Sequence, residues 1–467
     1  VARDAADEPD PRRWLALIVC CSALFMTLLD VSVTNVALPS IARATDASPA
    51  QLQWVVSGYT LAFGLVPVLA GRLGDDHGRR LMFQVGVGSF AVTSMSAGLA
   101  PTAEVLIAAR VLQGLAGGLI NPQVSGLVQQ MFGSAERGRA FGVLGTTVGV
   151  GTALGPLVGG ALIALGGPHV GWRLVFFVNI PVGIAVIVLA RRLLPTHQHD
   201  GRHRLDIVGA ALLGAATFCI LFAAVQYDSA RDARLALLAI PAAILLIVFF
   251  RRERRLTRAQ QDPLVDLRLF RVPSYSAGVF FALAYFPAMA GLPLVLAIYY
   301  QDGLGYTALQ SGIGVTAYAI GSAIGAPVAG RFVTRIGRPL LLVGLACFAV
   351  GAIALAVLAG HGAAALAPAL FLMGAGSGAC ITPNQALSLM RVDPVAGSTA
   401  GGVLQTAQRI GIAIGQATIG AAFFAALSRG GYAHALRIGV GAGLTFLAIA
   451  TAISVVDLVR TRRRISA

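Results

Sequence analysis

The chain has few charged residues: Asp, Glu, Lys and Arg together make up 12% of its 467 positions, and none of them is lysine. Soluble domains carry about 25% charged residues, so this scarcity excludes an ordinary water-soluble protein. Hydrophobic residues make up 57% of the chain, and the mean hydropathy is +0.78. Because long apolar runs recur throughout, we expect an all-α membrane protein.

Side chains that carry metal-dependent or hydrolytic chemistry are also sparse. The five cysteines lie in apolar runs without metal-ligand spacing, and we interpret them as small core residues. All seven histidines fall in or beside predicted loops, and no Ser/His/Asp set occurs within an apolar run. These absences argue against an intramembrane enzyme and indicate neither a metal nor another cofactor.

The apolar runs predict fourteen transmembrane (TM) helices. They are residues 14–38, 52–70, 81–100, 104–131, 139–166, 172–193, 206–226, 234–250, 274–300, 310–330, 339–359, 363–390, 398–427 and 434–457. Most of the 35 arginines fall in loops on the N-terminal side. By the positive-inside rule, both termini are cytoplasmic, in a multi-pass protein of the cell (inner/plasma) membrane. The basic loops then face anionic lipid headgroups of the bilayer rather than nucleic acid.

The chain repeats internally. Residues 70–79 after the second span recur in outline as residues 329–338 after the tenth. Two halves related in this way are parallel repeats about an axis along the membrane normal. The predicted parts are a cytoplasmic N-terminal tail (1–13), a six-helix bundle (14–193), linkers with an extra two-helix hairpin at about 206–250 (194–273), a second six-helix bundle (274–457) and a cytoplasmic tail (458–467).

Asp30 lies deep inside the first apolar run. A carboxylate at that depth costs about 2.5–3.5 kcal/mol on insertion scales and is rarely kept unless it faces a cavity. Such an acid can hold a proton near neutral pH, so Asp30 is our candidate proton carrier. A packing role, with the carboxylate satisfied by a neighbouring helix, is the alternative. Since no other acid lies clearly at mid-depth, we expect a low proton stoichiometry and only a modest preference for cationic substrates.

Arg110 and Arg409 are the two arginines inside predicted spans. The guanidinium of Arg110 stays charged and needs a partner, and Asp30 is the acid available at mid-depth. We therefore predict that Arg110 stabilises ionised Asp30 until substrate or a conformational change weakens the contact. The alternative is that Arg110 caps backbone carbonyls near the outer end of its span. Arg409 has no obvious acidic partner, and its guanidinium could contact either a backbone carbonyl or the substrate.

The loop between spans two and three reads Gly71-Arg-Leu-Gly-Asp75-Asp-His-Gly78-Arg79-Arg. It resembles the signature loop of the major facilitator superfamily, G-x-L-x-D-x-x-G-R-R/K. The resemblance implies the major facilitator fold, and a loop that acts as a conformational latch rather than as a substrate site. In the second copy Thr334 stands where Asp75 does, so we expect the latch to be asymmetric.

The fifth span is rich in glycine. Its stretch 151–160 resembles the antiporter motif of the superfamily's proton-driven exporters, and the residues concerned are Gly151, Gly155, Pro156, Gly159 and Gly160. Glycines four residues apart make a smooth face for close helix approach, and the proline bends the helix. The stretch 110–114, which contains Arg110 and Gln113, is similar to the R-x-x-Q-G motif of the same exporters. For the stretch 151–160, the alternative is generic packing of a glycine-rich helix without an antiporter role.

Residues 29–39, 54–59 and 299–312 are similar to the fourteen-span drug:proton antiporter branch. This resemblance implies alternating-access antiport, in which the proton gradient drives efflux of apolar or amphipathic small molecules such as drugs or antibiotics. We expect a monomer. Candidate substrate-cavity residues are Asn35, Tyr59, Gln113, Asn121, Tyr285, Met289, Tyr318, Asn384, Gln405 and Arg409. A dedicated exporter of one natural product or metabolite, an importer or symporter, and a transport-inactive sensor or scaffold are the alternatives.

Overall fold

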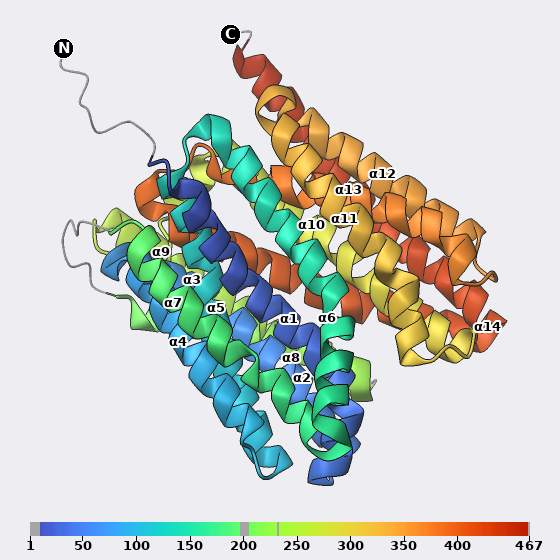
Figure 1. The fold of residues 1–467 in the computed structure, drawn as a ribbon. Helices are drawn as coiled ribbons and strands as arrows, with labels where there is room; N and C mark the ends of the chain where they lie inside the picture. The colour runs from blue at the N-terminus through green and yellow to red at the C-terminus, as the bar shows by residue number, and fades with distance from the viewer. Residues whose placement is uncertain (1–9, 197–204, 231–232, 466–467) are drawn as a thin grey trace.

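The computed structural model describes residues 10–196, 205–230 and 233–465; tail residues 1–9, the linker arginines Arg202 and Arg204 and the last two residues lie outside it. The described chain is almost entirely helical and contains no β-strand (Figure 1). Its main helices are α1 (Arg13–Thr45), α2 (Pro49–Leu65), α3 (Pro67–His77), α4 (Arg79–Gly98), α5 (Ala103–Met131), α6 (Ser134–Phe177), α7 (Asn179–Leu193), α8 (Ile207–Ala230), α9 (Ala239–Arg258), α10 (Pro273–Ile298), α11 (Ala308–Ile336), α12 (Pro339–Val357), α13 (Ala363–Leu389) and α14 (Gly397–Ile465). Short helical turns are η1 (Ala233–Leu238), η2 (Leu267–Arg271), η3 (Tyr299–Gly303) and η4 (Pro394–Ala396).

Two of these helices are broken by glycine. Gly167 in α6 and Gly431 in α14 both have a φ of 74°, a conformation that residues with a side chain rarely adopt. In Figure 1 the chain reverses direction at each break. By length and composition, ten described helices could cross a membrane, or eleven when α2 and α3, bent by 48°, count as one span. That count takes α14 as a single helix, and the total of fourteen spans stays a prediction.

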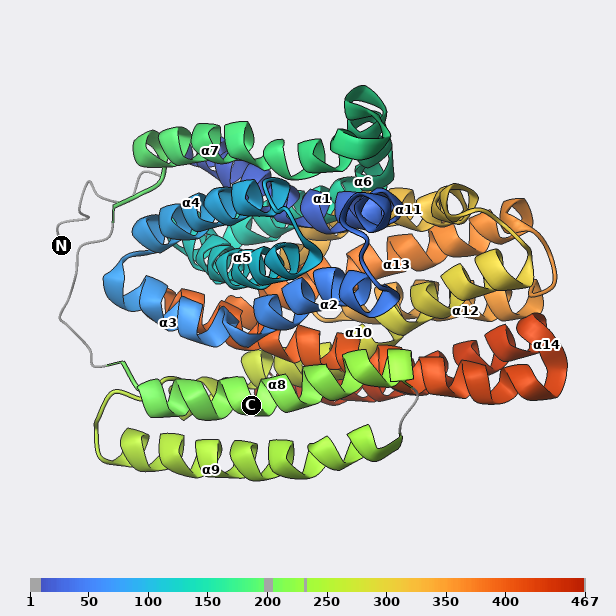
Figure 2. The same ribbon diagram turned by 90° about the horizontal axis from the view of Figure 1, so that it is seen from below.

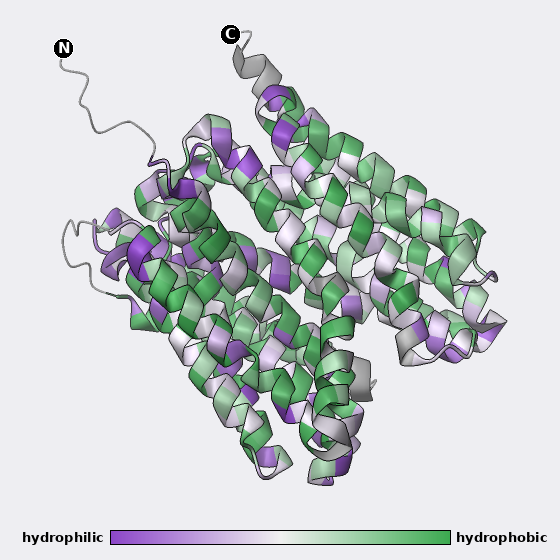
Figure 3. Ribbon diagram, viewed as in Figure 1, coloured by the Kyte–Doolittle hydropathy of each residue, from purple (hydrophilic) through white to green (hydrophobic). Residues whose placement is uncertain are grey.

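The helices pack as two groups, α1–α7 and α10–α14 (Figure 1). In the first group α1 packs on α6 and α5 packs on α2 and α4; in the second, α10 packs on α14 and α13 packs on α11 and α12. Apolar residues cover the lengths of the helices, whereas hydrophilic residues gather toward their ends (Figure 3). This pattern suits a lipid environment. The predicted domain bounds stay a proposal, which this packing supports.

The two groups touch closely at the end of the molecule that carries Arg13 and the last turns of α14. A Cβ added to Gly138 of α6 would lie 2.7 Å from the carbonyl oxygen of Gly330 on α11. A Cβ added to Gly402 of α14 would lie 2.2 Å from the carbonyl oxygen of Pro67 on α3. Glycine at these positions lets the backbones approach more closely than any other residue would allow. We call this the termini end of the bundle.

The hairpin formed by α8 and α9 lies along one side of the bundle (Figure 2). Helix α8 packs against α2 and α14 as well as against α9. Its Leu221 and Ala224 form an apolar cluster with Leu61 of α2 and Ala413 of α14. The hairpin therefore covers the seam at which α2 meets α14, one helix from each group.

Candidate functional site

Asp30 lies on α1 and is buried, with a side chain that is 0% exposed. Its Oδ2 accepts a hydrogen bond from Nη1 of Arg110 on α5, in an ion pair. Its Oδ1 accepts one from Nε2 of Gln113 at 2.9 Å and one from Nδ2 of Asn179 on α7 at 2.9 Å. Donors from two helices, α5 and α7, thus hold the carboxylate of a third, α1. A protonated carboxyl is neutral, carries an O–H donor and accepts more weakly, so protonation of Asp30 would weaken these contacts.

Arg110 combines both contacts that the sequence left open. Besides Asp30, its Nη1 donates to Oε1 of Gln113 at 2.8 Å, and its Nε donates to the carbonyl oxygen of Val55 at 3.1 Å. The guanidinium carbon lies 4.3 Å from the ring centroid of Tyr59 and 5.7 Å from that of Phe176. These contacts matter because removing one partner of a buried ion pair typically costs 3–5 kcal/mol.

Asn179 was not among the predicted site residues. It begins α7, is 1% exposed, and also donates to Oγ of Ser94 at 3.0 Å. Ser94 in turn donates to the carbonyl oxygen of Phe176 at 2.9 Å. The available signal in the sequence was a single amide inside the apolar run 172–193. An amide is a weaker signal than a charge within such a run, so the pattern does not single out Asn179.

The loop around Gly78 joins the two groups. Asp75 accepts hydrogen bonds from the backbone N–H groups of Ser398 and Thr399 at 3.1 and 2.8 Å, and from Oγ1 of Thr399 at 2.8 Å. These N–H groups belong to the first turn of α14, where the helix dipole favours a negative charge. Asp75 also pairs with Nη2 of Arg79 at 2.8 Å. Gly78, with a φ of 99°, makes the turn between α3 and α4.

Arg79 makes the same connection from the other side. Its guanidinium donates to the carbonyl oxygens of Pro394 and Val395, the latter at 3.2 Å, and to that of Gly126 at 2.8 Å. The contacts of Asp75 and Arg79 together cross from α3 and α4 to the start of α14. Gly71 belongs to the same junction, because a Cβ there would lie 2.3 Å from the carbonyl oxygen of Ser398.

The second copy of this loop makes a different contact. Arg338 occupies the position that corresponds to Arg79, but Thr334 stands in place of the acid. Nε of Arg338 lies 2.5 Å from Oδ2 of Asp457 in the last turns of α14, and Nη2 donates to the carbonyl oxygen of Ser274 at 2.7 Å. These contacts stay within the second group. In the described structure, therefore, the first copy of the loop connects the two groups through an acid–arginine pair, whereas the second copy does not.

The glycine-rich stretch of α6 packs against α1 around Asp30. A Cβ on Gly155 would lie 2.0 Å from Cβ of Ser32, and one on Gly159 would lie 3.0 Å from a methyl group of Val33. A Cβ on Gly151 would lie 3.3 Å from the aromatic ring of Phe25 and from Cβ of Leu28. Gly160 has no atom within 4 Å of such a Cβ, and the side chain of Pro156 lies outside the description.

The predicted cavity residues fall into separate places. Tyr59 and Gln113 contact Arg110, while Gln405 and Arg409 lie on α14 opposite α5 and α2. Four others make their contacts within the second group of helices. Tyr285 is buried against Phe281 and Phe348, and Tyr318 donates to Oγ of Ser377. Asn384 donates to the carbonyl oxygen of Gly278, and Met289 packs against buried apolar residues. Asn35, on α1, is exposed. Asn121 is half-buried, and its Oδ1 has no hydrogen-bond partner.

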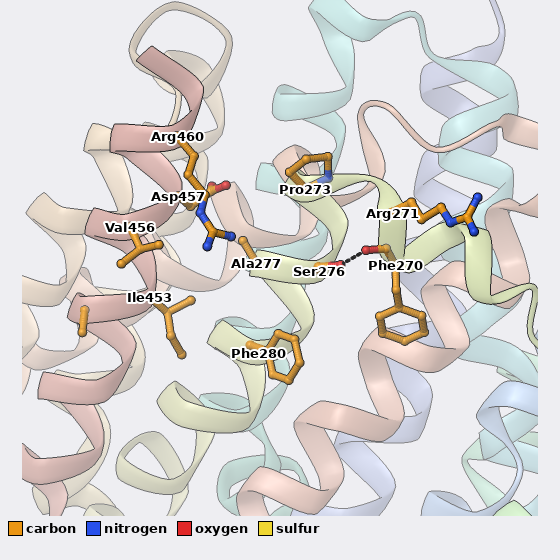
Figure 4. Close-up of a pocket in the computed structure, with 11 residues that line it drawn as sticks. Phe270, Arg271, Pro273, Ser276, Ala277, Phe280, Ile453, Val456, Asp457 and Arg460 are labelled. Carbon is orange, nitrogen blue, oxygen red and sulfur yellow. Dashed lines mark hydrogen bonds between the residues drawn. The ribbon is translucent and has the colours of Figure 1, made fainter. Parts of the chain in front are cut away.

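A groove of about 600 Å³ lies elsewhere, between α10 and the last turns of α14 (Figure 4). It is lined by Phe270, Arg271, Pro273, Ser276, Ala277, Phe280, Ala452, Ile453, Val456, Asp457 and Arg460. None of these is a predicted site residue, so the groove is separate from the Asp30 site. Among the residues that the structure describes, no group of three or more His, Cys, Asp or Glu is placed to hold a metal ion.

Long apolar helices that hold a buried ion pair, and a charged junction between two helix groups, are features of membrane transporters. The chain belongs to the Major Facilitator Superfamily, whose sequence model matches residues 20–416. It is 37% identical to a "Probable actinorhodin transporter" of Streptomyces coelicolor, over 91% of this chain and 74% of that protein. It is 31% identical to "Multidrug resistance protein Stp" of Mycobacterium tuberculosis, over 89% and 76%.

Solved structures share the fold. The human organic anion transporter MFSD10 superposes with a TM-score of 0.68 at 16% identity, over 95% of this chain and 100% of that one. The proton:xylose symporter XylE superposes with a TM-score of 0.67 at 14% identity, over 94% and 95%. At this identity the likeness shows the architecture alone.

Proposed function

We propose that this protein exports apolar or amphipathic small molecules and takes up protons in exchange. Relatives at 31–37% identity over about nine-tenths of the chain carry names of antibiotic transporters and multidrug resistance proteins. The observation that carries proton coupling is the Asp30–Arg110 pair, in which an acid is buried within a bundle of apolar helices and held by donors from neighbouring helices.

The arginine distribution supports an orientation with the termini end in the cytoplasm. The contacts of Asp75 with α14 and of Arg79 with η4 would then close the protein toward the cytoplasm in this conformation. In the opposite state these contacts would separate, and the space between the groups would open inward. Asp75 and Arg79 would therefore act as a latch that stabilises one of two states.

The coupling step takes place at Asp30. With the carboxylate ionised, Arg110, Gln113 and Asn179 hold it as observed. When a proton from outside binds, the O–H must donate, the donors shift, and the contact between α1 and α5 loosens. Release of that proton to the cytoplasm restores the pair. One charge moved through 100 mV supplies about 2.3 kcal/mol, enough for a substrate gradient of about fortyfold.

A single natural product as cargo is the second candidate. It is favoured by the relatives named for one compound each, among them a "Tetracenomycin C resistance and export protein" of Streptomyces glaucescens at 32% identity over 90% of this chain. A panel of compounds separates the two candidates. Substrate-evoked proton release from purified protein would occur with one compound for a dedicated exporter and with several for a multidrug pump.

The Asp30→Asn variant tests proton coupling. Asparagine keeps the volume of the side chain but cannot ionise, so we expect proton-driven efflux from inverted vesicles to fall to background while substrate binding survives. Asp302→Asn, at an exposed acid in η3, should transport like the parent protein. Full proton-driven efflux by Asp30→Asn would rule out the coupling role of Asp30.

A further inference from the structure

Arg409 is a permanent positive charge in the interior of the transporter. It lies twelve residues after Gly397, the first residue of α14, which is about 18 Å along the helix axis at 1.5 Å per residue. A bilayer has a hydrocarbon core of about 30 Å. Since α14 begins at the latch, Arg409 lies near the middle of the membrane, where a guanidinium needs compensation.

The described structure shows no acid and no hydrogen-bond acceptor on Arg409. Its guanidinium carbon instead lies 4.3 Å from the ring centroid of Phe63 on α2. A cation–π contact offsets only part of the cost of removing the charge from water. The other intramembrane arginine, Arg110, is neutralised by Asp30. The central region between the two groups therefore carries one positive charge for which the described chain supplies no counter-charge.

Aromatic rings and a second polar group without a partner lie next to this charge. The rings of Phe63 and Tyr59 have centroids 5.9 Å apart, and Arg110 lies over Tyr59. The hydroxyl of Tyr59 is buried and makes no hydrogen bond among the described residues, although the residue is only 3% exposed. Arg110, Tyr59, Phe63 and Arg409 thus form a continuous row from the proton site to α14.

Helix α8 explains how Arg409 is kept away from lipid. A Cβ on Gly64 would lie 2.5 Å from Cδ1 of Leu221 on α8 and 3.9 Å from Cβ of Arg409. Leu221 also clusters with Ala413, one turn after Arg409 on α14. The extra hairpin therefore covers the seam beside this residue.

We propose that Arg409 binds the anionic group of an aromatic substrate, a carboxylate or a phenolate, while Phe63 and Tyr59 contact its rings. The proposal rests on the export function above and specifies its substrate class as aromatic organic acids. An anion supplies the missing counter-charge, and the guanidinium presents donors that match a carboxylate. At one proton per substrate, exporting a monovalent anion moves two charges across the membrane per cycle, whereas exporting a neutral analogue moves one.

The test is equilibrium binding of two matched probes to the purified full chain in detergent at pH 7. Anthraquinone-2-carboxylate is the acid, and anthraquinone-2-carboxamide is its neutral analogue of similar shape. We expect the acid to bind about tenfold more tightly than the amide. Arg409→Gln should reduce this ratio to about one, while Arg409→Lys should keep part of it.

Two further variants guard against a trivial result. Arg437→Gln removes a positive charge from an exposed site on the same helix and should leave the preference for the acid unchanged. Phe63→Leu should weaken both probes by a similar factor and keep the preference, which tests the site even if Arg409→Gln fails to fold.

Equal binding of acid and amide by the parent protein, unchanged preference in Arg409→Gln, or no binding of either probe would overturn the proposal. Because no gradient is present, this experiment is independent of export. If the acid is preferred but vesicles show no proton-driven efflux, the proposed function fails and the anion site stands.

Discussion

At the scale of single residues, the site is built from charges and amides that satisfy one another. Asp30 receives donors from Arg110, Gln113 and Asn179, and Gln113 accepts from Arg110 as well as donating to Asp30. A buried polar network of this kind is stable only while every member keeps a partner. Losing one neutral member should therefore cost stability without removing any charge.

Asn179→Leu tests this expectation. Leucine has a similar size but cannot donate, so Oδ1 of Asp30 would lose one of its two hydrogen bonds. We expect a loss of about 1–3 kcal/mol in the free energy of unfolding, measured by denaturant unfolding in detergent. Asn35→Leu replaces an exposed asparagine on α1 and should change stability by less than about 0.5 kcal/mol. Equal losses in both variants would contradict the role of Asn179.

The sequence alone pointed to Asp30 and Arg110 because a charge inside an apolar run is conspicuous. It did not point to Asn179, nor to Ser398 and Thr399 as partners of Asp75. Those partners donate through their backbone N–H groups, which every non-proline residue has. Which of them is available depends on where α14 begins, and that is decided by packing rather than by local sequence.

At the scale of helices, residue spacing predicted which face of a helix is packed more reliably than it predicted which helix packs against that face. Glycines four residues apart indicated one smooth face on the fifth span, and that face lies against Ser32 and Val33 of α1. Nothing in the spacing identifies α1 as the neighbour. The end of α1 also differs from the prediction: the helix continues to Thr45, past residue 38, with Pro39 inside it. Membrane helices tolerate such a proline because neighbouring groups satisfy the freed carbonyl.

The hairpin carries a buried acid outside its apolar stretch. Glu253, in the charged end of α9, is 0% exposed and accepts a hydrogen bond from the backbone N–H of Val265 at 2.9 Å. Burial raises the pKa of Glu253 from an ordinary 4.5 to about 7, and the nearby charge of Asp206 acts in the same direction, while the hydrogen bond from Val265 opposes it. The folded protein therefore binds this proton more tightly than the unfolded chain does.

This gives a pH dependence of stability with a definite sign. The contribution of protonated Glu253 to the free energy of unfolding is fully present below about pH 4.5, and it is lost as the pH rises through about 7. Glu253→Gln stays neutral, so its melting temperature should fall less than that of the parent between pH 5 and pH 8, by about 2 °C. Asp46→Asn, at an exposed acid, should follow the parent. Parallel melting curves for the parent and Glu253→Gln would show that Glu253 does not titrate in this range.

At the scale of the whole molecule, the two copies of the repeated loop differ: the first joins the two groups at the termini end, and the charged contact of the second stays within its own group. Asp75 reaches across to the first turn of α14 and Arg79 to η4 just before it, while Arg338 pairs with Asp457 inside its own group. If the protein alternates as we propose, opening this end would break the first set of contacts and leave the second intact. The internal repeat and Thr334 predicted an asymmetric latch, but the substitute partner Asp457 lies about 120 residues away in sequence and could not be found by pattern.

Asp75→Asn should shift the balance of states toward opening at the termini end. The substitution replaces one of the two acceptor oxygens by an NH₂ group, which would face the N–H group of either Ser398 or Thr399, and it removes the charge that pairs with Arg79. Loss of charge-assisted bonds of this kind is worth about 1.5–3 kcal/mol, which corresponds to at least a tenfold change in the ratio of states. Hydrogen–deuterium exchange of the peptide covering residues 394–404 should become correspondingly faster.

Asp76→Asn is the matched control, because Asp76 is the next residue in the same helix and its ion pair with Arg72 stays within α3. We expect the exchange of residues 394–404 to be unchanged in that variant. Acceleration in both variants would mean that any loss of charge loosens the loop. Acceleration in neither would mean that the glycine contacts of α6 and α3, rather than Asp75, hold this end closed. Only faster exchange confined to Asp75→Asn supports a latch in which the carboxylate of Asp75 binds the first turn of α14.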